Sequence, residues 1–114
     1  MKTMRNSVIL IGRPGNDPQM KTTNNDKKKA SYRLAVAEAH TGADRQRTYT
    51  TQWFNMVAWG KQADKVESLV RKGNKMLIHG TLHNNEWTNA EGKRQTKTEI
   101  LIDGFSLIEE KKVS

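Results

Sequence analysis

The apolar residues of this chain come in short runs, most with a two-residue period, and turn residues separate the runs. Residues 8–11 form a β-branched run that the glycines and prolines of residues 12–18 bring to an end. Residues 30–39 place Tyr32 and Leu34 on one parity, and the chain enters this segment through polar residues. The pattern therefore predicts a first strand at 8–11 and a second, half-buried strand at 30–39.

The middle of the chain changes its period. Residues 48–59 are rich in Thr, Tyr, Trp, Phe and Val, which predicts a third strand. Residues 62–72 then predict one helix that ends before Gly73, a residue suited to the position after a helix. The apolar residues at three- and four-residue steps are Ala63, Val66, Leu69 and Val70.

Extended structure resumes after the helix. Residues 75–87 and 95–102 predict two strands, joined by a turn at 89–92. The order is three strands, one helix and two strands. This element order predicts an all-β OB-fold, a five-stranded Greek-key barrel with one helix between strands 3 and 4.

The length of 114 residues predicts a single domain over 1–114, with a core at about 6–108 and a short end at 109–114. Lys and Arg number 20 against 12 Asp and Glu, which gives a net charge of +8. Most of the excess lies in residues 1–58. A basic surface of this kind indicates a polyanionic partner.

Several function classes are disfavoured by what the chain lacks. It has no cysteine, so it has no disulfide and no thiolate ligand for a metal. His79 and His83 are four residues apart on a predicted strand, which separates their Cα atoms by about 13 Å, too far for one metal site. No nucleophile and base form a recognisable motif. We therefore expect no enzyme activity, metal or cofactor. The first apolar run is too short for a signal peptide or membrane span, so we expect a cytoplasmic protein.

The three tryptophans are candidates for base stacking. Trp53 and Trp59 share a parity, so they point to one face of the predicted strand, and Phe54 and Met56 point to the other face. Exposed aromatic rings beside cations form a sequence-tolerant platform for single strands, whose base faces a duplex hides. The alternative from the pattern alone is that Trp53 and Trp59 belong to the barrel core. Trp87 lies among polar residues at a hairpin tip, where a core position is less expected.

Candidate phosphate contacts are cations scattered beside the aromatic segments, as a groove that follows a nucleic-acid backbone requires. They are Arg13, Lys21, Arg33, Arg45, Arg47, Lys61, Arg71, Lys72, Lys93, Arg94 and Lys97. We interpret the run of three lysines at 27–29 as a solubilising loop.

Four motifs in order resemble the bacterial single-stranded DNA-binding proteins over residues 7–108. Residues 8–18 are similar to the opening strand of that family and its glycine-rich turn. Residues 51–61 resemble its central signature, an aromatic strand that leads into Gly-Lys and the helix. The segment from residue 72 to Trp87 resembles the approach to its third stacking aromatic. Residues 98–100 are similar to its closing strand.

This resemblance implies an OB-fold homotetramer that coats single-stranded DNA without sequence preference and needs no cofactor. By position, it implies base stacking by Trp53, Trp59 and Trp87. It also implies basic positions near the DNA path, at Lys21, Lys61, Arg71 and Lys72.

The chain departs from the family in three places. His40 stands where many members have a tryptophan, and it can stack with less area. His83, Asn85 and Glu86 occupy a hairpin where the family often has Arg or Lys, and we expect the cations across the turn to compensate. The chain ends without the acidic tail that recruits other proteins in typical members, so we expect no tail-mediated partners.

The sequence therefore predicts a homo-oligomeric, nucleoid-associated protein that binds single-stranded DNA in replication, recombination and repair. Two alternatives stay open. One is a single-stranded RNA-binding OB module, because stacking and phosphate contacts suit either strand type. The other is an OB module whose aromatic face binds another protein.

Overall fold

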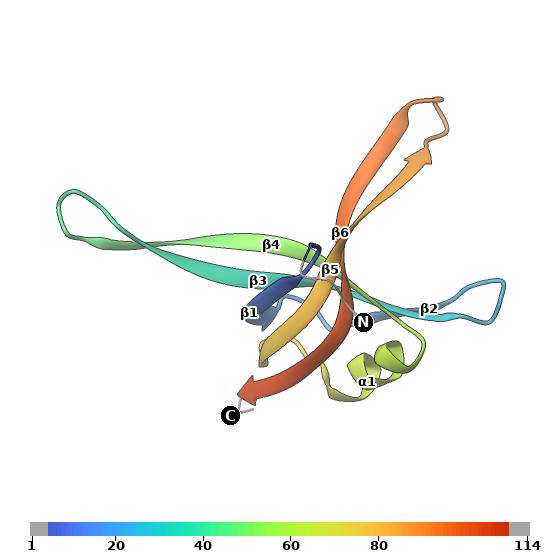
Figure 1. Ribbon diagram of the computed structural model, residues 1–114, viewed down its shortest axis with the longest axis horizontal. Helices are drawn as coiled ribbons and strands as arrows, with labels where there is room; N and C mark the ends of the chain where they lie inside the picture. Colours follow the sequence, from blue (N-terminus) through green and yellow to red (C-terminus); the bar gives the residue numbers. More distant parts are fainter. Residues whose placement is uncertain (1–4, 110–114) are drawn as a thin grey trace.

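The computed structural model describes residues 5–109, which form a small barrel with one helix at its end and three projecting hairpins (Figure 1). Its longest dimension is 53 Å, against 37 and 34 Å for the other two. The elements are β1 (Val8–Pro14), β2 (Gln19–Thr22), β3 (Lys28–Thr41), β4 (Arg47–Trp59), α1 (Lys61–Leu69), β5 (Lys75–Thr88) and β6 (Arg94–Glu109).

The strands follow the order β1-β5-β6-β4-β3-β2, and β1 also pairs with β3, so that five of them close a barrel. β3 and β4 pair along almost their whole length, as do β5 and β6. Two short seams complete the circle. β1 meets β3 at Arg13 and Pro14, and β4 runs parallel to β6 where Met56 lies opposite Ile100 and Val57 opposite Leu101. The prediction of an all-β OB-fold barrel is confirmed.

The predicted strand count was too low by one. The short β2 pairs with the start of β3, with Gln19 opposite Ser31 and Lys21 opposite Lys29. The helix therefore follows the fourth strand and not the third. β2 escaped prediction because four mostly polar residues carry no periodic signal, and its extended form depends on pairing with β3.

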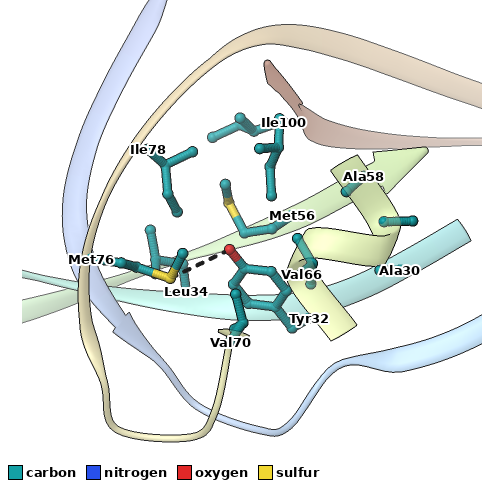
Figure 2. Packing of buried hydrophobic residues seen from close by; sticks show 12 residues of the cluster. Ala30, Tyr32, Leu34, Met56, Ala58, Val66, Val70, Met76, Ile78 and Ile100 are labelled. Atoms are coloured by element: carbon teal, nitrogen blue, oxygen red, sulfur yellow. Dashed lines mark hydrogen bonds between the residues drawn. The ribbon is translucent and has the colours of Figure 1, made fainter. Parts of the chain in front are cut away.

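The barrel is filled by alternate residues of the long strands, with α1 covering one end (Figure 2). Leu34 and Met56 are fully buried, and the Tyr32 hydroxyl donates to Met76 Sδ at 3.6 Å. Burial raises the pKa of Tyr32, because water no longer stabilises the phenolate. The parity predicted for 30–39 is confirmed, since Tyr32 and Leu34 both point into this core.

The helix is shorter than predicted. It ends at Leu69, because Val70 is already extended (φ −85°, ψ 127°), although Val70 remains fully buried. The Arg71 guanidinium donates to the carbonyls of Glu67 and Val70 at 2.7 and 2.6 Å, and so binds carbonyl groups at the helix end. Gly73 does have a positive φ of 88°, but it lies in the turn before β5 and not directly after the helix.

Barrel closure depends on the close approach of β1 to β3. A Cβ atom on Gly12 would lie 2.4 Å from the Ala35 carbonyl oxygen, which is too close for any side chain. Gly12, which the sequence predicted to be in the turn segment 12–18, is therefore part of β1 and allows β1 to cross β3 closely.

The paired strands extend beyond the barrel as hairpins, each drawn as a long ribbon in Figure 1. The β3–β4 hairpin points to one side, the β2–β3 hairpin to the other, and the β5–β6 hairpin projects between them. β6 continues to Glu109, beyond the predicted end at residue 102. Among residues 5–109, no helix is long and apolar enough to cross a membrane.

Candidate nucleic-acid interface

Trp53 and Trp59 lie on the outer face of β4. Their side chains are 48% and 37% exposed, whereas Met56 and Ala58, on the other parity, are buried. In the register, Trp53 lies opposite Ala35 and Trp59 opposite Lys29 of β3. The predicted parity is thus confirmed, and the two indoles belong to the outer face and not to the barrel core.

A cation and a glycine both lie close to the Trp53 ring. The Arg33 guanidinium carbon lies 4.6 Å from the ring centroid, within cation–π range. A Cβ atom on Gly15 would lie 2.5 Å from the ring, so the absence of a side chain there lets the indole lie close to the backbone. The Gly15 amide donates to the Arg33 carbonyl at 2.8 Å, and Asn16 Oδ1 accepts from the Arg33 amide at 3.0 Å. These bonds fix the β1–β2 turn beside the indole.

Trp59 has two lysines over its ring. The Nζ atoms of Lys27 and Lys29 lie 5.7 and 5.5 Å from the centroid. Lys21 of β2 lies opposite Lys29, so it extends this row of cations on the same face. The sequence analysis did not identify Lys27 and Lys29 as site residues, because a run of three lysines has no parity of its own.

Lys28, between them, points the other way. Its Nζ binds Glu67 at 2.5 Å and Asp64 at 2.9 Å, both on α1. The hydrogen bond that Lys28 donates to Glu67, and then the one that it donates to Asp64, raise the pKa of Lys28. The interpretation of 27–29 as a uniform solubilising loop is therefore wrong: one lysine ties β3 to the helix, and its two neighbours cover Trp59.

The outer face of β4 continues along the β3–β4 hairpin. Tyr49 shares the parity of Trp53 and is 65% exposed, and Arg47 follows it on the same face. Arg45 lies in the tight turn at the tip with a positive φ of 64°. Sequence analysis missed Tyr49, although the parity that identified the tryptophans also includes it.

A groove lies between the two tryptophans. β3 and β4 contribute Arg33 and Asn55 to its lining, and β6 contributes Lys97 and Glu99. Because residues of β6 line the same hollow as residues of β4, the outer faces of the barrel and of the β5–β6 hairpin form one continuous surface.

The third tryptophan lies on the β5–β6 hairpin. Trp87 is 45% exposed and lies opposite Gln95, on the same parity as Lys97. Arg94 lies on the alternate parity, and its guanidinium binds Glu86 at 2.6 Å. Lys93 lies at the tip, where its amide donates to Asn89 Oδ1. The structure brings Lys97 to the groove and leaves Arg94 on the other side of the hairpin.

The other predicted cations lie on β1, on α1 and in the turn before β5, and Arg13 lies opposite Ala35, the residue that also faces Trp53 in the sheet. Arg13 donates to the Gly73 carbonyl at 2.7 Å and pairs with Glu109 at 3.4 Å. Arg71 binds the end of α1. Lys61 is the first residue of α1, and the Lys72 amide donates a hydrogen bond to Asp17 Oδ1 at 2.8 Å.

The register places His40 on the opposite parity from Tyr49 and Trp53. Its Nε2 atom lies 2.9 Å from Thr50 Oγ1. Its role in binding DNA stays a prediction. Within residues 5–109, no group of three His, Asp or Glu side chains is arranged to hold a metal ion.

The sequence profile described as the single-strand binding protein family matches residues 5–108. The single-stranded DNA-binding protein of Rickettsia conorii is 36% identical over 105 residues, which cover 89% of this chain and 68% of that protein. Single-stranded DNA-binding protein 1 of Chlorobaculum tepidum is 32% identical over 104 residues, or 90% of this chain and 64% of the relative. The chain thus spans about two thirds of the length of these relatives.

Two solved structures have the same fold. The Plasmodium falciparum SSB complex with ssDNA matches with a TM-score of 0.78 and 26% identity, over 97% of this chain and 99% of that one. A deletion mutant of the single-stranded DNA binding protein from Thermus aquaticus matches with a TM-score of 0.79 and 23% identity, over 91% of this chain and 50% of that one.

Proposed function

The chain belongs to the single-strand binding protein family, and on that premise we propose that it coats single-stranded DNA without sequence specificity. The observation that carries this proposal is the outer face of β4, where Trp53 and Trp59 are exposed beside cations. We propose a binding role for the chain and assign it no catalytic step.

Base stacking supplies the part of the affinity that is independent of sequence. Every base has a π-face, so an exposed indole accepts any of them, at about 1 to 3 kcal/mol per stacked base. Arg33 and Lys29 lie close enough to the rings to neutralise phosphates of a strand whose bases stack there. A duplex keeps its base faces stacked inside, so this surface favours single strands.

We propose that the path of the strand includes both the barrel face and the β5–β6 hairpin. Trp87 and Lys97 lie on the continuous outer surface and extend it away from the barrel. Tyr49 and Arg47 extend it along the other hairpin. Arg13 and Arg71 have intramolecular partners, so we expect smaller contributions from them.

We further propose self-association, with a tetramer as the expected assembly. On β1, Ile9 is 66% exposed and Ile11 is 47% exposed, and the partly exposed Leu77 lies opposite Ile11 on β5. This apolar face lies apart from the groove. Residues 8–12 pair with β5 on one side, while β3 meets β1 only at Arg13 and Pro14 in the described chain, which leaves a strand edge suited to a second copy.

A protein that coats single strands acts wherever DNA is unwound. We therefore propose roles in replication, recombination and repair, and a location at the nucleoid in the cytoplasm. These roles follow from the proposed ligand.

A fluorescence titration tests the ligand and the face together. Tryptophan emission is followed while an unstructured thymidine oligomer is added, then duplex DNA, then a uridine oligomer, each over a range of salt. We expect quenching by the single-stranded DNA that weakens as salt rises. Equal or stronger binding of the RNA would favour an RNA-binding module, and no quenching by any nucleic acid would favour a protein partner for the aromatic face.

A further inference from the structure

The outer face of the β3–β4 hairpin (Figure 1) carries two exposed aromatic rings, four residues apart on β4. Trp53 is 48% exposed and Tyr49 is 65% exposed, and both point to the same face of the strand. At about 3.3 Å per residue, their Cα atoms are separated by about 13 Å. Four intervals of about 3.4 Å, the spacing of stacked bases along a strand, equal this span. A stack of three bases therefore fits between the two rings.

One side of the Trp53 ring is already occupied. The Arg33 guanidinium lies over the ring, and Arg33 is on the barrel side of Ala35, the residue opposite Trp53. Gly15 also lies against the ring, and its amide donates to the Arg33 carbonyl, which places Gly15 on the barrel side as well. A base that stacks on Trp53 therefore takes the side of the ring that points toward the tip of the hairpin.

A hollow of about 450 Å³ lies on that side of Trp53, and Ala35 and Ala37 of β3 and Thr51 of β4 line it. Thr51 and Ala37 lie opposite each other in the register, between the positions of the two aromatic rings. Their short side chains leave room for bases above the sheet. The volume of the hollow is within the range of pockets that hold small ligands.

Positive charge lies at both ends of this span. Lys75 of β5 lines the hollow beside Trp53, together with Arg13 of β1. Arg47 lies on the same face as Tyr49, at the next alternate position toward the tip of the hairpin. Aromatic rings for stacking and cations for phosphates are the two components of a surface that binds single strands. The charge of this face complements a polyanion, which favours a nucleic-acid strand over an apolar surface of another protein.

Resting on the proposed function, we infer that Tyr49 is a base-stacking residue, and that about three consecutive bases stack between the Tyr49 and Trp53 rings, over the hollow. The indole ends this stack on the barrel side and the phenol ring ends it on the side of the hairpin tip. Lys75 and Arg47 neutralise phosphates beside the stack. The β3–β4 hairpin thus holds a short run of bases between two rings, in addition to the bases on the barrel.

The first test replaces Tyr49 and measures the Kd for a labelled thymidine oligomer of fixed length by fluorescence anisotropy. Tyr49→Ala should weaken binding by about fivefold to tenfold, at the lower end of the range for one stacked base, whereas Tyr49→Phe keeps a ring and should stay within about twofold of the unaltered protein. The matched control is Gln52→Ala, at an exposed position on the other face of β4, which should also stay within about twofold. Unchanged affinity in Tyr49→Ala, or an equal loss in Tyr49→Phe, would overturn the inference.

A double-mutant cycle tests whether the two rings share one stack. Removing either ring loosens a shared stack, so Tyr49→Ala combined with Trp53→Ala should lose severalfold less affinity than the product of the two separate losses. Tyr49→Ala combined with Trp59→Ala is the reference, in which the losses should multiply. Losses that multiply for both pairs would overturn the shared stack and leave the proposed function standing. Failure of the unaltered protein to bind any oligomer would instead overturn the proposed function and this inference together.

Discussion

Trp59 on the barrel and Trp87 on the β5–β6 hairpin are similarly exposed aromatic residues of one continuous surface, but the cations around them differ. Lys27 and Lys29 lie over the Trp59 ring. Lys28, between them, forms ion pairs with the carboxylates of α1. Near Trp87, Arg94 is paired with Glu86 and points to the other side of the hairpin. Counting the cations near an aromatic residue in the sequence therefore overestimates the positive charge available to a ligand there when strand parity and ion pairs are ignored.

The largest expected effect comes from removing both barrel tryptophans. Trp53→Ala combined with Trp59→Ala should cost about 2 to 6 kcal/mol of binding free energy, because each loses one stacked base and the two sites are far enough apart to add. Fluorescence anisotropy with a labelled thymidine oligomer measures the loss. Thermal unfolding verifies that the barrel is intact, and a folded variant with unchanged affinity would contradict the stacking role.

The next effect is that of Trp87→Ala, which tests the comparison directly. We expect a loss of about 1 kcal/mol, at the lower end of the range for one stacked base, because the nearest arginine is neutralised. The single variant Trp59→Ala, measured in the same assay, is the reference. An equal or larger loss for Trp87→Ala would mean that the hairpin contributes as much as the barrel.

Salt dependence separates the cations of the two regions. In a plot of log K against log salt, Lys29→Gln should make the slope shallower by about 0.7, the value for one phosphate contact on a single strand. Arg94→Gln, with the same change in charge, should leave the slope almost unchanged. Equal effects of the two substitutions would remove the distinction between the regions.

The smallest expected effect is a gain in affinity for single-stranded DNA. Glu86→Gln frees the Arg94 guanidinium and removes one negative charge from the hairpin, so affinity should rise by less than about 1 kcal/mol, as for other exposed ion pairs. Titration at low salt gives the best sensitivity. The combination Glu86→Gln with Arg94→Gln is the control, and it should lose most of the gain.

The sequence alone predicted which way side chains point where a strand alternates between the core and the outer surface. Parity placed Trp53 and Trp59 on one face and Met56 on the other, and the register confirms it. Parity could not show that Arg94 pairs with Glu86, because that bond joins two strands. Strand alternation also places His40 on the parity opposite to Trp53, whereas the family resemblance implies a stacking residue at that position.

The helix shows why apolar spacing predicts burial better than it predicts conformation. Val70 fits the helical spacing and is fully buried, yet its backbone is extended. Leu69 fits the same spacing and is largely exposed. The core needs an apolar side chain at Val70, and either conformation of the backbone can supply it.

The groove also lies over the short parallel seam between β4 and β6. Within residues 5–109 these strands pair only where Met56 meets Ile100 and Val57 meets Leu101, so this is a natural place for the barrel to open. A strand of DNA that contacts both Asn55 and Lys97 would link β4 to β6 across the seam and so oppose its opening. Occupancy should therefore slow amide hydrogen exchange there, and the protein should melt at a higher temperature the more DNA it carries.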